Sequence, residues 1–186
     1  AASDVYKRQV EDTAVSPEKL PEFVRRFDDI IRQHGTEAGY YGHASVGCLH
    51  IRPLIDLKAV SGVERMTSIS TSISDLVLEF GGSMSGEHGD GLVRSIWNEK
   101  MFGSKIYAAF KEVKTAFAPH GIMNPGKIVD SPPMTNNLRI DPSYRPRQIE
   151  TSLFLNQERT FETAVEMCNG QGACRKITSG TMCPSY

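Results

Sequence analysis

The chain has 186 residues, of which 39% are apolar and 23% charged, so it can bury a core and form one domain with part of a second. Its 21 basic and 22 acidic side chains leave a formal net charge of −1, which excludes the strongly basic surface of a typical nucleic-acid-binding protein. No apolar run reaches the roughly 20 residues of a membrane span, and no signal-peptide core follows the N-terminus. We therefore expect a soluble, cytoplasmic protein with no nucleic-acid partner and no transmembrane segment.

Composition divides the chain into four parts. Residues 1–9, AASDVYKRQ, share no pattern with the rest of the chain, and we interpret them as a leader that is not native to the protein. Residues 10–129 carry regular apolar periodicity and are predicted to form one domain. Residues 130–164 begin with a stretch rich in proline and asparagine and predict a linker, and 165–186 form a short segment with three cysteines.

The first predicted helix has clear start and end signals. Ser16 is a typical cap, Pro17 suits the first helical position, and Glu18 places an acid in the first turn. Gly35 supplies the stop. The residues that repeat at helical spacing between these signals are Leu20, Phe23, Val24, Phe27, Ile30, Ile31 and His34.

A stretch rich in glycine and aromatic residues follows, with two short runs typical of strands at 39–43 and 48–54. A second helix is predicted over 57–80, and the pair Gly81-Gly82 ends it. Its predicted buried side consists of Val60, Val63, Met66, Ile69, Ile73, Val77 and Phe80.

A third helical pattern begins near Val93, is interrupted at Gly103 and ends before Pro119 and Gly121. Helices that alternate with short strands in this order predict an α+β fold, with helices packed on one face of a small, mostly antiparallel sheet.

The motif GHASVGCLH carries two histidines, His43 and His50. Seven residues apart on one straight strand, they would point to opposite faces, because side chains alternate along a strand. A turn or bulge at 45–47, which Gly47 favours, would let both imidazoles converge. The alternative is one structural histidine and one surface histidine.

The motif GGSMSGEHGDG carries the pair Glu87 and His88 between glycines, where the backbone is expected to approach another group closely. It is not a nucleotide P-loop, since no Gly-Lys-Ser/Thr follows. The alternative is a glycine-rich turn with a solvated charge pair.

Together, the two motifs supply His43, His50 and Glu87, a set of two histidines and one carboxylate that suits a divalent metal such as zinc, manganese or iron. His88 would then be a free imidazole beside the metal, suited to general-base catalysis near neutral pH. A metallohydrolase would use the same residue types.

Three cysteines, Cys168, Cys174 and Cys183, crowd the end of the chain, and this arrangement suggests metal ligation rather than a secreted disulfide scaffold. Cys168 and Cys174 keep the outer spacing of a bacterial ferredoxin run, and Cys183-Pro184 resembles its closing dipeptide. A zinc ribbon and a disordered thiol-bearing tail are the alternatives. Three cysteines cannot complete a four-cysteine site, so we interpret the chain as a fragment. Cys48 stands alone and fits core packing.

The segments GHASVGCLHIRP, GGSMSGEHGDGLVR and HGIMNPGKI, in this order, resemble the C-terminal half of FAD-linked oxidases of the vanillyl-alcohol-oxidase superfamily. That family includes the D-lactate, glycolate and D-2-hydroxyglutarate dehydrogenases, and the resemblance implies a ferredoxin-like α+β domain. The tail CNGQGACRK…GTMCPSY resembles the start of the iron–sulfur module fused behind this domain in long bacterial members. The resemblance covers roughly residues 10–186.

The resemblance implies a role for each matching position. His43, His50 and Glu87 match the family's metal ligands, and His88 matches the base that takes the hydroxyl proton of the substrate. The closing motif, with Asn124 and Lys127, is expected to lie near the flavin. One departure is that many relatives have Gly-Asp-Gly-Asn where this chain has Ser-Val-Gly-Cys at 45–48, which bears on the substrate more than on the reaction.

Two arginines, Arg52 and Arg94, follow the two motifs closely and are candidates for binding a substrate carboxylate. Arginine suits bidentate recognition of such a group. The alternative is that both are ordinary surface residues.

The sequence therefore predicts part of an FAD-dependent 2-hydroxyacid dehydrogenase that oxidises a D-2-hydroxy acid of the lactate, glycolate or 2-hydroxyglutarate type. Electrons would pass to an iron–sulfur module, expected to hold a 4Fe–4S cluster, and on to an acceptor. The expected partners are an N-terminal FAD-binding domain, a C-terminal iron–sulfur domain and, in one possible assembly, a second copy of the chain. The fragment alone is expected to be inactive. The alternatives are a metal-dependent hydrolase using the His/His/Glu site and a non-catalytic electron-transfer module.

Overall fold

A computed structural model describes residues 12–152, 155 and 160–167 of the chain. The fold is α+β, as predicted, and is built on a three-stranded antiparallel sheet with the strand order β1-β3-β2. The strands are β1 (Thr13–Ala14), β2 (Ala38–His43) and β3 (Cys48–Pro53). The α-helices are α1 (Leu20–Gln33), α2 (Val60–Glu79), α3 (Gly91–Arg94), α4 (Asn98–Phe117) and α5 (Phe161–Glu166). The short 3₁₀-helices are η1 (Pro17–Lys19), η2 (Ala44–Val46) and η3 (Ser95–Trp97).

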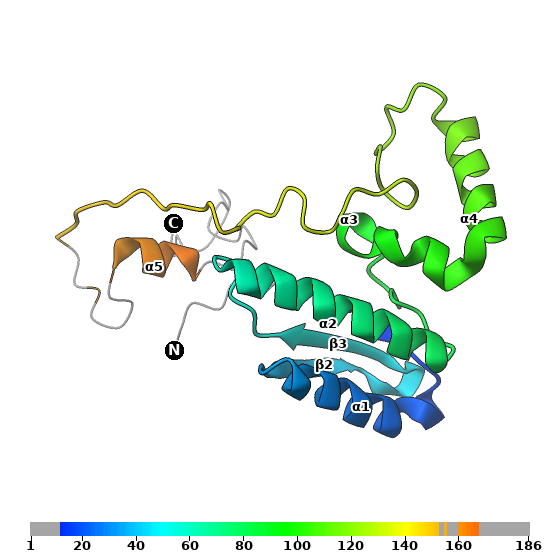
Figure 1. The fold of residues 1–186 in the computed structure, drawn as a ribbon, viewed down its shortest axis with the longest axis horizontal. Coiled ribbons are helices and arrows are strands. Elements are labelled where there is room, and N and C mark those ends of the chain that lie inside the picture. The colour runs from blue at the N-terminus through cyan, green and yellow to red at the C-terminus, as the bar shows by residue number, and fades with distance from the viewer. Residues whose placement is uncertain (1–11, 153–154, 156–159, 168–186) are drawn as a thin grey trace, which may run out of the picture.

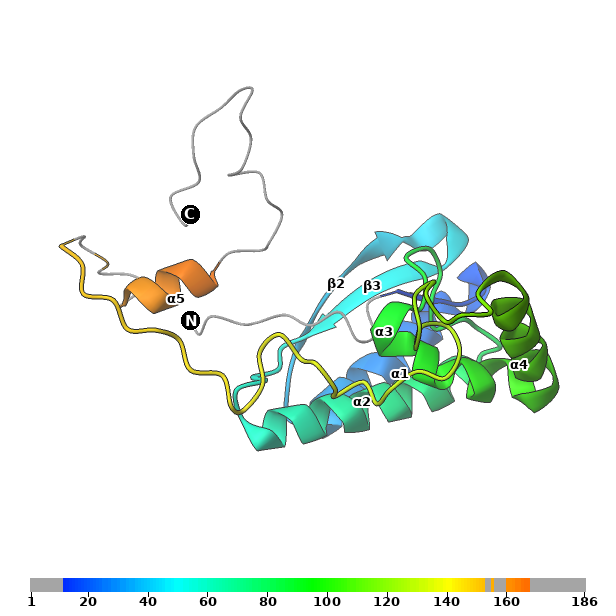
Figure 2. The same cartoon turned by 90° about the horizontal axis from the view of Figure 1, so that it is seen from above.

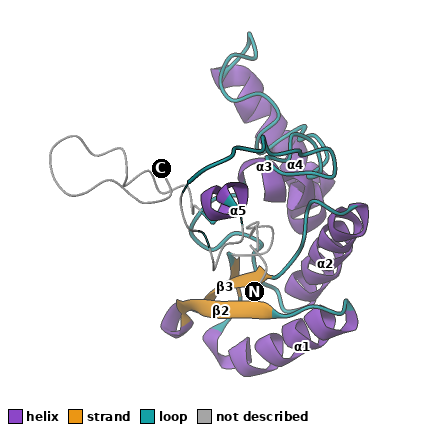
Figure 3. Ribbon diagram, turned by 90° about the vertical axis from the view of Figure 1, so that its left-hand side faces the viewer, coloured by secondary structure: helices purple, strands orange, loops and turns teal. Residues whose placement is uncertain are grey.

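The two long helices α1 and α2 lie side by side along one face of the strands (Figures 1 and 3). Figure 2 shows both helices on the same side of the β2–β3 hairpin. This arrangement confirms the prediction that helices cover one face of a small antiparallel sheet. The core between helices and sheet is formed by Phe23, Phe27 and Ile31 of α1, Met66, Ile69, Ile73, Leu76 and Val77 of α2, and Leu49 and Ile51 of β3.

Helix α1 follows the sequence signals closely. Phe23, Phe27 and Ile31 are spaced by four residues, so they share one helix face, and all three are fully buried. Gly35 adopts a left-handed conformation with φ of 65° and ends the helix, as predicted.

Helix α2 begins at Val60 rather than at residue 57. Met66, Ile69, Ile73 and Val77 are buried as predicted, but Val60 is 62% exposed. Side chains on a helix lean toward its N-terminus, so a residue at the first position has no preceding turn to cover. The prediction that Val60 is buried was therefore wrong.

The third helical pattern is divided between α3, η3 and α4. Within α4, Gly103 has φ of 78° and ψ of 158°, values that break the helix at the position where an interruption was predicted. Beyond the break, the apolar side chains of Ile106, Val113 and Phe117 are exposed.

From residue 118 to 152, the structure has neither helix nor strand, which agrees with an irregular connection but does not test the domain boundaries. The short α5 is attached to the start of α2 by an ion pair, in which Lys58 Nζ lies 2.6 Å from Glu166 Oε2. The proposed leader at 1–9 and the three C-terminal cysteines lie outside the described residues. In the part of the chain that is described, every helix is too short or too polar to span a lipid bilayer.

Candidate functional site

The candidate site begins with the register of the β2–β3 hairpin. His43 pairs with Cys48, and Tyr41 pairs with His50, so these four side chains share one face of the sheet. Directly before β3, Gly47 has φ of 73°, and a Cβ atom there would lie 1.7 Å from the carbonyl oxygen of Val15, so only glycine fits. The expected turn therefore exists, and it brings the imidazoles of His43 and His50 together, with ring centroids 5.7 Å apart.

This face is opposite to the one that the helices cover. Along β3, Leu49 and Ile51 point into the core, whereas His50 and its alternate neighbours point to the other side. One short strand therefore contributes both to the hydrophobic core and to the candidate site.

The glycine-rich loop 82–90 is held against β1. Ser83 and Ala14 exchange two backbone hydrogen bonds of 2.8 and 2.9 Å, and the Gly86 N–H donates to the backbone oxygen of Asp12 at 2.6 Å. A Cβ atom on Gly86 would lie 2.9 Å from Cys48 Sγ and 3.1 Å from the Ala14 Cβ. The absence of a side chain at position 86 thus lets the loop lie close to both strands, as the motif predicted.

The loop places the Glu87 carboxylate beside His43 and His50. Glu87 Oε1 lies 2.8 Å from His50 Nε2, 3.2 Å from His88 Nε2 and 3.6 Å from His43 Nε2. The His50 and His88 rings are stacked, with centroids 4.7 Å apart and planes inclined by 16°. Three imidazoles therefore surround a single carboxylate oxygen, and we call His43, His50, Glu87 and His88 the histidine cluster.

The histidine cluster is open on one side. The side chain of His50 is only 3% exposed, whereas that of His43 is 60% exposed, and Glu87 and His88 are each partly exposed. The cluster is therefore open to solvent at His43, and His50 forms its buried end.

The chemistry of the donors fits a divalent metal. Around zinc, ligand atoms about 2.1 Å from the metal lie roughly 3.4 Å from one another, and Glu87 Oε1 lies 2.8 Å from His50 Nε2 and 3.6 Å from His43 Nε2. The set of imidazole nitrogens and one carboxylate oxygen is typical of zinc, manganese or iron. Among the described residues, the group in which one possible ligand atom from each member lies within 4.8 Å of the others is Asp12, Cys48, His50 and Glu87, and it does not include His43. Metal ligation by His43, His50 and Glu87 stays a prediction, and Asp12 and Cys48 were not among the predicted ligands.

Asp12 is a central residue that the sequence analysis missed. Its side chain is fully buried and accepts hydrogen bonds from the Ser85 hydroxyl at 2.6 Å, the His88 N–H at 2.8 Å and the Glu87 N–H at 3.1 Å. Burial alone would raise the pKa of Asp12, but these hydrogen bonds and the nearby Arg94 together lower the pKa below its ordinary value of 3.8. Asp12 follows Glu11 and precedes a short apolar run, and this context does not signal its role, because the loop that it binds lies more than 70 residues away.

Cys48 lies beneath the histidine cluster as a buried thiol, with Sγ 3.8 Å from Asp12 Oδ1. Burial, together with the negative charges of Asp12 and Glu87, raises the pKa of Cys48 to about 11. Cys48 is buried as predicted, but it lies on the site face of β3 and not among the apolar side chains between the helices and the sheet.

The two candidate arginines have different surroundings. Arg52 lies on the same face of β3 as His50, donates a hydrogen bond to the Tyr41 hydroxyl at 2.5 Å and places its guanidinium 4.9 Å from the centroid of the Tyr41 ring. Arg94 is buried, donates to the Gly89 carbonyl at 2.5 Å and lies 3.7 Å from Asp12 Oδ2. Arg94 therefore supports the loop from inside, and its position gives no support to a role in binding the substrate carboxylate.

Asn124 and Lys127 lie in the loop that follows α4. The Lys127 ammonium donates to Asn124 Oδ1 at 3.2 Å, and Lys114 donates to the Asn124 carbonyl oxygen at 2.9 Å. These contacts stabilise the loop, and the expected position near the flavin remains a prediction.

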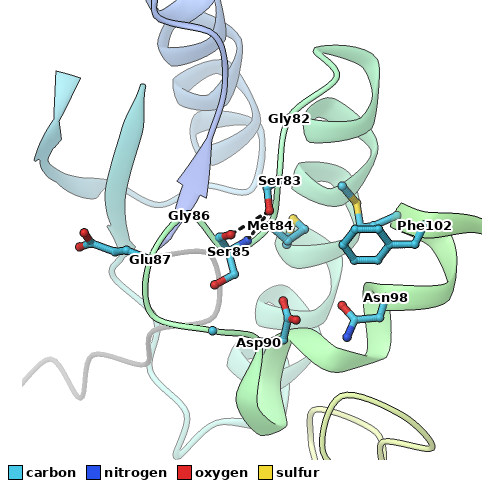
Figure 4. A pocket seen from close by; sticks show the side chains of 11 residues that line it. Gly82, Ser83, Met84, Ser85, Gly86, Glu87, Asp90, Asn98 and Phe102 are labelled. Atoms are coloured by element: carbon cyan, nitrogen blue, oxygen red, sulfur yellow. Dashed lines mark hydrogen bonds between the residues drawn. The ribbon is translucent and has the colours of Figure 1, made fainter. Parts of the chain in front are cut away.

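A cavity of about 350 Å³ lies between the loop and the start of α4. Figure 4 shows Ser85, Asp90, Asn98 and Phe102 around it, whereas the Glu87 side chain points away from it. The cavity is therefore on the other side of the loop from the carboxylate that joins the histidine cluster. No pattern in the sequence predicted this cavity.

Fold and site together define a class of protein: an α+β domain whose sheet is covered by helices on one face, while two histidines of the sheet meet Glu87 and His88 of the loop at the other. Residues 6–128, more than half of the chain, match the family described as FAD linked oxidases, C-terminal domain. The chain belongs to this family of FAD-linked oxidases.

Similar curated proteins carry related names. The chain is 34% identical over 180 residues to a D-2-hydroxyglutarate dehydrogenase of Haemophilus influenzae, covering 95% of this chain and 17% of the relative. It is 35% identical over 184 residues to the D-2-hydroxyglutarate dehydrogenase of Escherichia coli, covering 94% of this chain and 17% of the relative. A D-lactate dehydrogenase of Archaeoglobus fulgidus is 34% identical over 122 residues, covering 65% of this chain and 26% of the relative. The chain thus spans less than a fifth of the length of these two D-2-hydroxyglutarate dehydrogenases.

Proposed function

We propose that the complete protein oxidises a D-2-hydroxy acid to the 2-oxo acid and that the histidine cluster forms part of its active site. The observation that carries this proposal is the convergence of three imidazole nitrogens on Glu87 Oε1 at the open face of a domain from the FAD-linked oxidase family. Relatives named as D-2-hydroxyglutarate and D-lactate dehydrogenases support the class of substrate. Relatives named as D-2-hydroxyglutarate dehydrogenases include those that match 94–95% of the chain as well as one that matches 63%, and this recurrence leads us to favour a substrate of the 2-hydroxyglutarate type.

His43, His50 and Glu87 would hold a divalent metal. Such an ion, when bound, acts as a Lewis acid and lowers the pKa of a substrate hydroxyl. Beneath these three residues, the buried Asp12 carboxylate accepts hydrogen bonds from the Cys48 thiol and from the Glu87 N–H, and these contacts fix the backbone of Glu87.

His88 would act as the general base. Its ring is partly exposed and is stacked on the buried His50, so its orientation is restrained while Nε2 stays at the cluster. In the neutral form, Nε2 can accept the proton of the α-hydroxyl. The hydrogen of the α-carbon leaves with its electron pair as the C=O bond of the 2-oxo acid forms. The flavin of this family, when bound, supplies the acceptor for that hydride.

Arg52 is the better of the two candidates for binding the substrate carboxylate. It lies on the face of the sheet that carries His50, and stacking on Tyr41 keeps its guanidinium at the edge of the cluster. A planar guanidinium can form two parallel hydrogen bonds with a carboxylate.

We further propose that Cys168, Cys174 and Cys183 begin an iron–sulfur module that receives the electrons from the flavin and holds a 4Fe–4S cluster. These residues lie outside the described structure. Their spacing and the similarity of nearly the whole chain to long relatives support the proposal. The partners of this chain would then be the flavin-binding and iron–sulfur portions of the complete protein and an external electron acceptor.

The test is a turnover assay on the full-length protein with D- and L-2-hydroxyglutarate, D-lactate and glycolate, each with a reducible dye as acceptor. We expect D-2-hydroxyglutarate to reduce the dye fastest, and His88→Ala to lower kcat by a factor of about 100 to 10,000. A matched control is His34→Ala, because His34 contacts Ile30 and Ser68 instead of the cluster. Full turnover in His88→Ala, or a protein without flavin absorbance that hydrolyses its substrate, would contradict the proposal.

A further inference from the structure

Asp12 binds the loop that carries Glu87 and His88 at four consecutive residues. Its carboxylate accepts from the Ser85 hydroxyl, the Glu87 N–H and the His88 N–H, and its backbone oxygen accepts from the Gly86 N–H. The hydrogen-bond lengths range from 2.6 to 3.1 Å. Glycines at 86, 89 and 91 would allow this loop many backbone conformations. The hydrogen bonds to Asp12 hold it in one of them.

Asp12 is also tied to the strand that carries His50. The next residues form β1, in which Thr13 pairs with Leu49 and Ala14 pairs with Cys48 of β3. Asp12 therefore joins two segments that contribute to the cluster from distant parts of the sequence. Through it, the position of the Glu87 backbone is set relative to His50.

The contacts of Asp12 require an acceptor at both carboxylate oxygens. The Ser85 hydroxyl, two backbone N–H groups and the Cys48 thiol donate to it, and the Arg94 guanidinium adds a positive charge 3.7 Å from Oδ2. An asparagine has the same shape, but its NH₂ group would face donors and leave some of them unsatisfied. Asp12→Asn is therefore a sharp probe that changes hydrogen-bond polarity with little change in volume.

We propose that Asp12 is a positioning residue: it orients Glu87 and His88 against His43 and His50 so that the cluster can hold a divalent cation. The inference rests on the proposed function, since it concerns the same site. Asp12 acts through the loop backbone, because His88 Nδ1 lies 3.9 Å from Asp12 Oδ1, beyond a normal hydrogen bond.

The experiment measures the affinity of Mn²⁺ for the full-length, chelator-treated protein by electron paramagnetic resonance, which detects free Mn²⁺. The variants are Asp12→Asn, Ser85→Ala, and Ile73→Ala as a control that weakens the hydrophobic core on α2 and removes no hydrogen bond of Asp12. Glu87→Gln identifies the signal of this site, because the variant should lose its tight Mn²⁺ binding. Thermal unfolding of each variant is recorded beside its Kd.

We expect Asp12→Asn to raise the Kd for Mn²⁺ by about 10- to 100-fold, the range observed when groups that orient metal ligands are removed. Ser85→Ala removes one donor and should raise the Kd several-fold, so it tests the inference even where Asp12→Asn folds poorly. Ile73→Ala should unfold at lower temperature and keep the wild-type Kd.

Two contrary results have different meanings. Tight binding in the wild-type protein with a Kd within twofold of it in both Asp12→Asn and Ser85→Ala would overturn the inference alone. A wild-type protein without a tight Mn²⁺ site would overturn the proposed metal site and, with it, this inference.

Discussion

The two faces of strand β3 differ in what they contact: one packs in the hydrophobic core and the other carries residues of the candidate site. Leu49 and Ile51 point toward α1 and α2 and belong to the hydrophobic core, whereas His50 and Arg52 point to the other face, beside Tyr41 and the histidine cluster. The face with the core is held by apolar burial and the other by hydrogen bonds and charge. Substitutions on the two faces should therefore separate stability from chemistry, although the residues involved are neighbours in the sequence.

The largest effect is expected for Glu87→Gln on the open face. The amide keeps the shape of the carboxylate but removes the charge to which three imidazoles converge, so turnover with a dye acceptor should fall by a factor of about 1,000 or more. The matched control is Glu79→Gln, since Glu79 is an exposed carboxylate paired with Arg26 at the end of α2. Turnover within tenfold of wild type in Glu87→Gln would contradict the claim that the histidine cluster carries out the chemistry.

On the helix-covered face, Ile51→Ala should act on stability. Ile51 is fully buried, so removing its side chain should reduce the free energy of unfolding by about 2–5 kcal/mol. Urea unfolding measures this loss, and kcat at a temperature where the variant is folded should stay close to the wild-type value. A variant with normal stability and lost turnover would show that the two faces are not separate in function.

The two arginines should also differ in their effects. Arg52→Ala should lower kcat/KM for the 2-hydroxy acid by about 10- to 100-fold, mainly through KM, because a charge-assisted hydrogen bond to the substrate would be lost. Arg94→Ala should reduce the free energy of unfolding by about 1–3 kcal/mol, because the Gly89 carbonyl loses a buried donor and the buried Asp12 carboxylate loses a nearby positive charge. Steady-state kinetics and urea unfolding on both variants test this, and the opposite assignment of the two effects would contradict it.

The smallest effect concerns Cys48. Because its pKa is raised to about 11, the thiol stays protonated at pH 8, and its alkylation by iodoacetamide should be at least roughly 100-fold slower in the native protein than in urea. The raised pKa also means that the stability contributed by the neutral thiol is complete below its unfolded pKa and declines as the pH rises toward 11. Mass spectrometry of the peptide that contains Cys48 measures the rate, and equal rates in both conditions would show that the thiol is accessible.

Much of the fold could be predicted because its signals are local. The helix over Leu20–Gln33 follows from a four-residue apolar spacing and its end at Gly35, and the hairpin follows from two short strands joined by a glycine turn. The convergence of His43 and His50 also follows from that turn.

The rest depended on contacts between distant segments. Nothing near Asp12 in the sequence indicates that its partners lie at 85–88, and nothing near Arg94 indicates that it turns inward to Asp12. Exposure of Val60 and Phe117 likewise depends on where their helices lie relative to other elements, which apolar periodicity alone does not determine. Apolar periodicity predicts where helices and strands lie in the sequence. Which side chains are buried or paired depends on how those helices and strands pack against one another.

The most direct test is an anomalous-scattering experiment at the zinc edge on crystals of the full-length protein grown with Zn²⁺. We predict a peak within about 2.0–2.2 Å of His43 Nε2, His50 Nε2 and a carboxylate oxygen of Glu87. A zinc peak that is bound elsewhere, with these three side chains free of metal, would contradict the proposed site.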